Sequence, residues 1–123
     1  MDITTIYKNK YFSILGDSIS TFEGISEPKT AAHYNKDLKI SAGMPTILDT
    51  WWGRVIDCLG GKLLVNNSWS GSTVCKLPAH ETTSYGCSDE RTSSLAKDGV
   101  LPDVIIVFLG ENDWGGWVSS NTK

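Results

Sequence analysis

The sequence predicts an α/β fold built on a parallel β-sheet, and two observations lead to this prediction. Three apolar runs of strand length, at 13–15, 63–65 and 104–109, alternate with two segments of helical pattern. Connections of this length between successive strands favour parallel pairing with right-handed crossovers. In addition, the run 104–109 is apolar without alternation, which is typical of a strand buried on both faces.

The first strand is expected at 13–15 and can begin as early as Tyr11, with Gly16 ending it. Residues 24–47 then form a long polar connection that contains glycine and proline. Loops of this length inside a compact domain are usually functional or mobile. We therefore expect a long loop in this part of the chain.

The first helix is predicted by an apolar stripe that recurs at helical spacing. The stripe consists of Leu48, Trp52, Val55 and Leu59, widened by Trp51, Ile56 and Cys58. Either Thr46 or Thr50 caps the start of this helix, and Gly60 and Gly61 end it. As part of the stripe, Cys58 is expected to pack in the core.

The second strand, 63–65, runs into an Asn-Asn pair. A second helix is predicted over 91–97, because the Ser-Asp-Glu sequence at 88–90 offers a cap and places acidic side chains at the positive end of the helix dipole. Gly99 ends this helix. The run 104–109 then completes the order strand, helix, strand, helix, strand.

Length and composition limit the class of protein. A chain of 123 residues makes one domain, 1–123. Its net charge of −3 argues against a nucleic-acid-binding surface, which needs clustered Lys and Arg. No stretch approaches the roughly 18 apolar residues of a membrane span. Because the N-terminus lacks the apolar core of a signal peptide, we expect a cytoplasmic protein; a secreted one is the alternative if a signal peptide has been removed.

The cysteines are not spaced as a metal site. Cys58, Cys75 and Cys87 contain no C-x-x-C pair and are odd in number, which argues against a disulfide framework or a cysteine zinc site. Cys75 and Cys87 flank one loop and can pair in an oxidising compartment, whereas free thiols are expected in the cytoplasm. No metal is expected.

Three polar motifs follow the three predicted strands. Gly-Asp-Ser occupies 16–18, Asn-Asn-Ser-Trp-Ser-Gly occupies 66–71, and Gly-Glu-Asn-Asp occupies 110–113. Ligands of such sheets bind beyond the carboxyl ends of the strands, so the three motifs should converge on one rim. Ser18 is the candidate nucleophile there, once a base removes its proton. The alternative is that Asp17 or Ser18 caps the segment that follows.

Two residues of the later motifs can stabilise an oxyanion. Gly71, in a Ser-Gly-Ser turn, lets a backbone N–H approach a ligand without a Cβ in the way. Asn112 offers a side-chain NH2, and with the N–H groups of Ser18 and Gly71 it can hold the oxyanion of a tetrahedral intermediate. The alternatives are plain turn formation for Gly71 and loop capping for Asn112.

In this order the three motifs resemble those of the SGNH hydrolases, also called GDSL esterases/lipases. The resemblance implies a flavodoxin-like sheet with flanking helices and strand order 2-1-3-4-5, of which this chain holds about three of five strands. It also implies a serine esterase, similar to bacterial enzymes, that hydrolyses small acyl or carbohydrate esters through an acyl-serine intermediate without a cofactor. Ser18 would be its catalytic residue, with Gly71 and Asn112 as oxyanion donors.

Neighbouring residues are expected to shape this site. Asp17 adjoins the serine and should organise its turn. Asn66 matches the asparagine that usually opens the family's glycine motif. The remaining site-shaping residues are Trp69, Asp113 and Trp114. Either tryptophan can wall an acyl or sugar pocket or pack in the core.

The family's general base, in an Asp-x-x-His motif, is not found in this sequence. The two histidines, His33 and His80, have Thr30 and Leu77 three residues before them, and both are expected at the surface. We therefore expect a C-terminally truncated domain that is weakly active or inactive alone. The alternative from another class is a non-catalytic domain that binds a carbohydrate or acyl ligand at the same rim. A flavodoxin-like module that cradles a phosphate explains neither Asn112 nor the glycine motif.

Truncation also has a structural consequence. Without further strands, the run 104–109 becomes an exposed apolar edge, and such an edge invites pairing or aggregation. The expected partners are therefore a small ester substrate and either a second copy of the chain or a separate C-terminal fragment that pairs with this edge.

Overall fold

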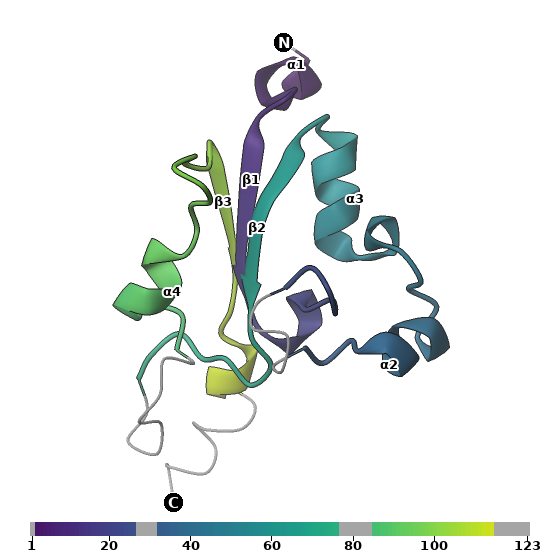
Figure 1. Cartoon of the computed structure of the whole chain (residues 1–123), viewed down its shortest axis with the longest axis vertical. Helices are drawn as coiled ribbons and strands as arrows, with labels where there is room; N and C mark the ends of the chain where they lie inside the picture. The colour runs from purple at the N-terminus through teal and green to yellow at the C-terminus, as the bar shows by residue number, and fades with distance from the viewer. Residues whose placement is uncertain (1, 27–31, 77–84, 115–123) are drawn as a thin grey trace, which may run out of the picture.

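Three parallel strands form the centre of the molecule (Figure 1). The computed structural model describes residues 2–26, 32–76 and 85–114. The strands are β1 (Tyr11–Gly16), β2 (Lys62–Ser68) and β3 (Val104–Phe108). β1 lies in the middle and pairs in parallel with both neighbours, so the sheet order is β2-β1-β3. The predicted α/β fold with a parallel sheet is confirmed, and this order agrees with the expected 2-1-3 sequence of strands.

The helices of the described residues are short. In chain order they are α1 (Ile3–Tyr7), η1 (Ser18–Ser20, a 3₁₀-helix), α2 (Lys36–Ser41), η3 (Ile47–Asp49, a 3₁₀-helix), α3 (Trp51–Cys58) and α4 (Asp89–Ser93). α3 and α4 lie on opposite sides of the sheet (Figure 1). Among these described helices, none has the length and apolar character needed to cross a bilayer.

The connection over 24–47 was predicted as a loop, which is wrong for one part of it. α2 forms there because the side chain of Asn35 accepts hydrogen bonds from the backbone N–H groups of Asp37 and Leu38. Such a cap satisfies N–H groups that a helix start leaves without an internal partner. A short polar helix of this kind has no apolar stripe by which it could be predicted.

β1 is the buried centre of the sheet because its side chains alternate between two covered faces. The core cluster on one face consists of Phe12, Ile14, Phe22, Trp52 and Ile56. On the opposite face, the buried hydroxyl of Ser13 donates a hydrogen bond of 2.7 Å to the backbone oxygen of Leu95, which follows α4. The strand that leads to the first motif is therefore fixed from both sides.

α3 begins later than its apolar stripe predicted. Thr50 caps it, with its hydroxyl oxygen accepting a hydrogen bond of 3.0 Å from the backbone N–H of Gly53. Thr46 instead starts η3, which contains Leu48. Both threonines therefore act as caps, but of two different helices.

The core face of α3 is narrower than predicted. Trp52 and Ile56 are buried, whereas Leu48, Val55 and Cys58 are exposed. The prediction that Cys58 packs in the core is therefore wrong, because it lies six residues after Trp52, on a different side of a helix with 3.6 residues per turn. All three cysteines of the chain are free thiols.

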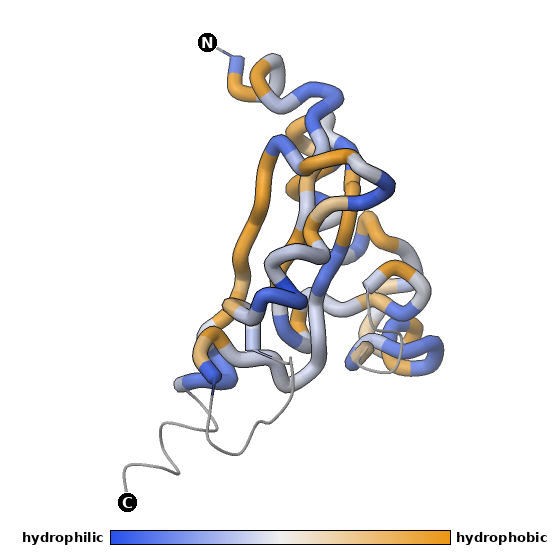
Figure 2. The backbone as a smooth tube through the Cα atoms, turned by 60° about the vertical axis from the view of Figure 1, so that its left-hand side comes forward, coloured by the Kyte–Doolittle hydropathy of each residue, from blue (hydrophilic) through white to orange (hydrophobic). Residues whose placement is uncertain are grey.

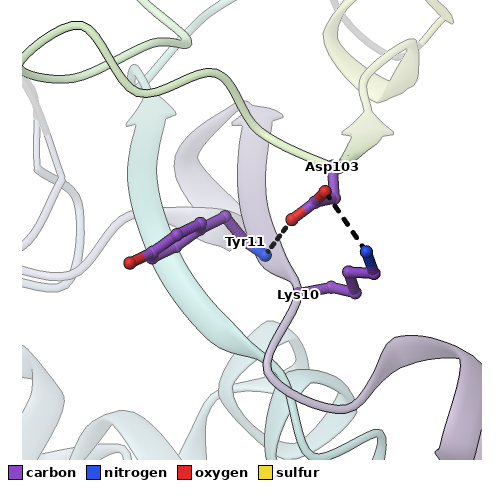
Figure 3. A network of polar contacts seen from close by, with 3 residues as sticks. All are labelled: Lys10, Tyr11 and Asp103. Atoms are coloured by element: carbon purple, nitrogen blue, oxygen red, sulfur yellow. Dashed lines mark hydrogen bonds and ion pairs between the residues drawn. The ribbon is translucent and has the colours of Figure 1, made fainter.

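The start of β3 is fastened to the start of β1 by the polar contacts that Figure 3 shows. The Asp103 carboxylate accepts a hydrogen bond of 2.8 Å from the backbone N–H of Tyr11 and lies 3.7 Å from the Lys10 ammonium group. The backbone N–H of Asp103 donates in return to the oxygen of Tyr11, over 2.8 Å. These contacts set the register of β3 against β1.

The prediction that 104–109 is buried on both faces is wrong for the described strand. Val104 and Ile106 pack against the core cluster, but Ile105 and Val107 face the other way and are 49% and 59% exposed. Figure 2 shows the apolar stretch along this strand. The helix predicted over 91–97 is also wrong in its bounds, because α4 begins at Asp89 and ends at Ser93.

Candidate active site

The first strand ends at a glycine that the packing requires. A Cβ on Gly16 would come within 2.7 Å of Ser20 and 2.8 Å of Ser68, so no other residue fits between β2 and η1 without displacing them. Asp17 follows, and Ser18 is the first residue of η1, where it is half-buried. The sequence Gly-Asp-Ser thus places the candidate nucleophile directly at the carboxyl end of the central strand.

Asp17 directs its carboxylate into its own turn. Its Oδ1 accepts a hydrogen bond of 3.0 Å from the backbone N–H of Ile19, as a cap of η1. Asp17 is 1% exposed, and burial raises the pKa of its carboxyl group, with the hydrogen bond from Ile19 opposing this and the charge of Glu111 adding to it. The side chain therefore stabilises the turn that carries Ser18.

The turn that carries Ser18 is also held by β2 and α3. The side-chain amide of Asn66 donates to the backbone oxygen of Ser20 over 2.9 Å, and the indole N–H of Trp51 donates to the Ser20 hydroxyl over 3.1 Å. Asn66 is buried and comes from the second motif. The first two motifs are therefore joined directly at the rim of the sheet.

The second motif forms a tight turn beside the first. The backbone N–H of Trp69 donates to the oxygen of Gly16 over 3.1 Å, and the N–H of Ser72 closes the turn onto the oxygen of Trp69, also over 3.1 Å. Gly71 has a φ of +78°, a conformation that favours glycine, and open space surrounds the position of a Cβ. Among the described residues, nothing within 4 Å of that position would block a ligand on this side of Gly71.

The third motif is attached to the second. The side-chain amide of Asn112 donates to the backbone oxygen of Ser72 over 2.9 Å. An amide NH2 carries two hydrogens, so this bond uses one of them. Asn112, which follows β3, is thus bonded to Ser72, the residue next to Gly71. Hydrogen bonds therefore connect the first motif to the second and the second to the third.

Asp113 strengthens this attachment. Its carboxylate accepts hydrogen bonds from the backbone N–H groups of Val74, at 2.8 Å, and Cys75, at 3.3 Å, and from the Cys75 thiol at 3.4 Å. Burial alone would raise the pKa of Asp113, but these hydrogen bonds outweigh it and the pKa lies below its usual value. The ionised carboxylate therefore fixes the segment that follows the glycine turn.

The two tryptophans of the motifs have different environments. The indole ring of Trp69 packs against the Arg91 guanidinium, with 4.9 Å between the ring centroid and Cζ. Trp114 is 79% exposed. Each tryptophan was expected either to wall a pocket or to pack in the core. Trp69 fits packing inside the fold, whereas Trp114 is accessible to a ligand.

Arg91 is the central residue of the site that the sequence analysis missed. Its guanidinium donates to the backbone oxygens of Gly16, at 3.0 Å, and Asn67, at 2.8 Å, to the Asn67 side-chain oxygen, and to the Ser72 hydroxyl, at 2.7 Å. It is fully buried, and burial lowers the pKa of Arg91 to about 10, with the charge of Glu90 acting in the opposite direction. It therefore stays protonated at neutral pH.

A weak sequence signal for Arg91 exists. It is the third residue of α4, close to the positive end of the helix dipole, where a cation is unfavourable. An arginine at such a position indicates that its side chain has partners elsewhere in the fold. Those partners come from β1, β2 and the glycine turn, so only the topology reveals them.

The histidines of the chain are placed as follows. His33 is exposed, and its ring packs edge-on against Tyr34 with 5.0 Å between ring centroids. His80 lies outside the described residues. In the part of the chain that the structure describes, no group of three or more His, Cys, Asp or Glu side chains is arranged to hold a metal ion.

Comparisons with known proteins agree with this arrangement. The sequence matches the GDSL-like lipase/acylhydrolase family over residues 10–122. The fold is similar to the crystal structure of a protein described as a GDSL-like lipase from Bacteroides uniformis ATCC 8492, with 36% identity, a TM-score of 0.61, and coverage of 85% of this chain and 49% of that one. A second, from Bacteroides ovatus ATCC 8483, gives 32% identity, a TM-score of 0.59, and coverage of 86% and 50%. No curated protein matches the sequence.

These matches establish the family. The family match extends over most of the chain and contains all three motifs. The chain spans about half the length of the two solved structures. The parallel sheet, the three strand-end motifs and the family match lead to one conclusion: this chain belongs to the GDSL-like lipase/acylhydrolase family.

Proposed function

We propose that this chain carries the nucleophile and the oxyanion-binding half of a serine esterase active site. The supporting observation is the series of hydrogen bonds that joins the three strand-end motifs, from the turn of Ser18 through Gly16 and Ser72 to Asn112. These bonds hold the segments of the proposed oxyanion donors in fixed positions. Preorganised donors stabilise the charge that develops in the transition state, and losing one typically costs about 10²–10³ in rate.

In the proposed reaction, the Ser18 hydroxyl oxygen attacks the carbonyl carbon of an ester. The carbonyl oxygen gains the negative charge and is held by the N–H groups of Ser18 and Gly71 and by the Asn112 amide. The carbon–oxygen bond to the alcohol then breaks, the leaving oxygen takes up the proton that a base has removed from Ser18, and an acyl group remains on Ser18. Water then loses a proton to the base and attacks the acyl carbon, and the proton returns to the serine oxygen as the acid is released.

The proton of Ser18 needs a base. The family's Asp-x-x-His motif is not found in the sequence, and His33 packs against Tyr34. Loss of the base of a serine triad costs about 10⁶ in kcat, and the oxyanion site and binding alone leave about 10³–10⁴ over water. We therefore propose that the chain alone turns over esters slowly and accepts a base from outside its own residues.

The substrate class that we propose is small acyl or carbohydrate esters. The exposed Trp114 indole, adjacent to the third motif, supports this proposal, because an accessible aromatic face can pack against an acyl chain or a sugar ring.

Added imidazole provides the test. Hydrolysis of p-nitrophenyl acetate is measured with the chain, with Ser18→Ala and with Asn112→Ala, each over a series of imidazole concentrations. We expect an imidazole-dependent rate for the chain above that of Ser18→Ala, acetyl-Ser18 in its mass spectrum, and a rate about 10²-fold lower for Asn112→Ala.

Two results would contradict the proposal. The first is equal rates for the chain and Ser18→Ala at every imidazole concentration, with no acetyl group on Ser18. The second is ester or sugar binding that survives Ser18→Ala without any acylation, which would indicate a non-catalytic binding domain.

A further inference from the structure

One buried side chain connects the turns from which the candidate site is built. Arg91 binds the backbone oxygen of Gly16, directly before the nucleophile turn, and the side chain and backbone of Asn67 in the second motif. It also binds the hydroxyl of Ser72, whose backbone oxygen accepts the hydrogen bond of Asn112. Arg91 thus reaches two motifs directly and the third through one residue.

These contacts fit the shape of a guanidinium group. Its donors lie in one plane and point in fixed directions, so partners on different elements are held at fixed relative positions. Nη2 donates to the backbone oxygens of Gly16 and Asn67, and Nη1 donates to the Ser72 hydroxyl. Nε donates to the side-chain oxygen of Asn67. The flat face packs against Trp69. A lysine has the charge but a single point of attachment, so it cannot hold all of these partners.

Burial excludes direct contact between this arginine and a substrate. Arg91 is 0% exposed, so its charge is not accessible to a substrate. Burying a cation is unfavourable unless hydrogen bonds replace its water, and hydrogen bonds to the turns of the rim contribute to this here. An apolar side chain could fill the same volume without the cost of desolvating a charge, so the arrangement needs an explanation beyond packing.

We propose that Arg91 is a positioning residue of the oxyanion site: it sets the glycine turn at Gly71 and, through Ser72, the Asn112 amide relative to Ser18. This inference rests on the proposed function of the site. Because misplacement of about 1 Å can cost about 10²-fold in rate, one rigid connection between three turns has a direct effect on catalysis.

The test uses the intact chain with Arg91→Lys, and Ile56→Val as a control. Ile56 is buried in the core cluster, whose members lie outside the three motifs, so loss of one methyl group destabilises the fold without removing a hydrogen bond of the rim. Two-dimensional NMR follows the backbone amides of Ser18 and Gly71 and the side-chain NH2 of Asn112, together with their hydrogen exchange. The rate of imidazole-dependent acetylation of Ser18 is measured on the same samples.

In Arg91→Lys we expect these three groups to shift and to exchange faster than in Ile56→Val, and Ser18 acetylation to fall roughly 10²-fold. Ile56→Val should keep the acetylation rate of the unchanged chain. If the Lys variant does not fold, Ser72→Ala removes one contact of the guanidinium, and the same selective changes are expected at Gly71 and Asn112.

The inference is overturned if the Arg91→Lys variant, or Ser72→Ala in its place, changes Ser18, Gly71 and Asn112 no more than Ile56→Val does. The NMR measurement does not depend on catalysis. If the unchanged chain shows no acetylation, the proposed function fails, while the spectra still decide whether Arg91 positions the rim.

Discussion

Two glycines at the rim are required for different physical reasons. At Gly16 the reason is space, because a Cβ would meet Ser20 and Ser68 within 2.8 Å. At Gly71 the reason is backbone conformation, because φ is +78° and the surroundings are open. Each reason predicts a different response to the size of a new side chain.

We expect Gly16→Ala to lower the free energy of unfolding by about 1–3 kcal/mol through overpacking. Gly71→Ala should cost about 1–2 kcal/mol through left-handed backbone strain. Asparagine tolerates the left-handed region better than alanine, so Gly71→Asn should recover part of the loss, whereas Gly16→Asn should add to it. Urea unfolding of the four variants measures this, and a recovery at Gly16 or none at Gly71 would contradict it.

At the scale of elements, the loop after the glycine turn is held by the end of β3. The Asp113 carboxylate accepts hydrogen bonds from two backbone N–H groups and from the Cys75 thiol. Because the pKa of Asp113 is lowered, the stability from its ionised form is present above its ordinary value of 3.8 and is lost as the pH falls through the folded pKa. Attachment of this loop to the third motif should therefore weaken in acid.

The same contact affects the reactivity of Cys75. The hydrogen bond to Asp113 raises the pKa of the Cys75 thiol, and burial and the charges of Asp113 and Cys87 act in the same direction. Since the thiolate is the reactive form, this slows alkylation near neutral pH. We expect Asp113→Asn to speed the reaction of Cys75 with iodoacetamide several-fold, followed by peptide mass spectrometry. The exposed Cys58 is the internal control, and an unchanged ratio of Cys75 to Cys58 labelling would refute the prediction.

The elements that the sequence predicts are those whose signal is local. The strands at 13–15, 63–65 and 104–109 were found because apolar runs bounded by turn residues are a property of the segment itself. The helix boundaries were less accurate. α3 begins after Thr50 rather than at Leu48, because a second cap at Thr46 starts a separate 3₁₀-helix.

The residues of the candidate site also differ in whether a local pattern reveals them. Ser18, Gly71 and Asn112 were selected because each lies in a motif that follows a strand and because the resemblance to the family implies their roles. The hydrogen bonds place their segments next to one another. Arg91 has no such motif. Its importance comes from partners that lie 19 to 75 residues away in sequence, and no local pattern encodes contacts of that kind.

At the scale of the whole molecule, one face of β3 exposes the apolar side chains of Ile105 and Val107. Both side chains are about half exposed, and Leu101, shortly before the strand, is 76% exposed. β3 is also the edge of the described sheet, because β1 is its strand neighbour there. Exposed apolar edges pair readily with other chains.

We expect the isolated chain to self-associate through this edge, and Val107→Lys to reduce the association, because a charge on an edge strand opposes pairing. Ile40→Lys is the matched control, since Ile40 is 61% exposed on α2, away from β3. Light scattering and sedimentation over a range of concentrations measure the mass. A monomer at every concentration, or an equal effect of both lysines, would contradict the prediction. Loss of association in Val107→Lys alone would locate the contact on β3, the edge strand of the described sheet.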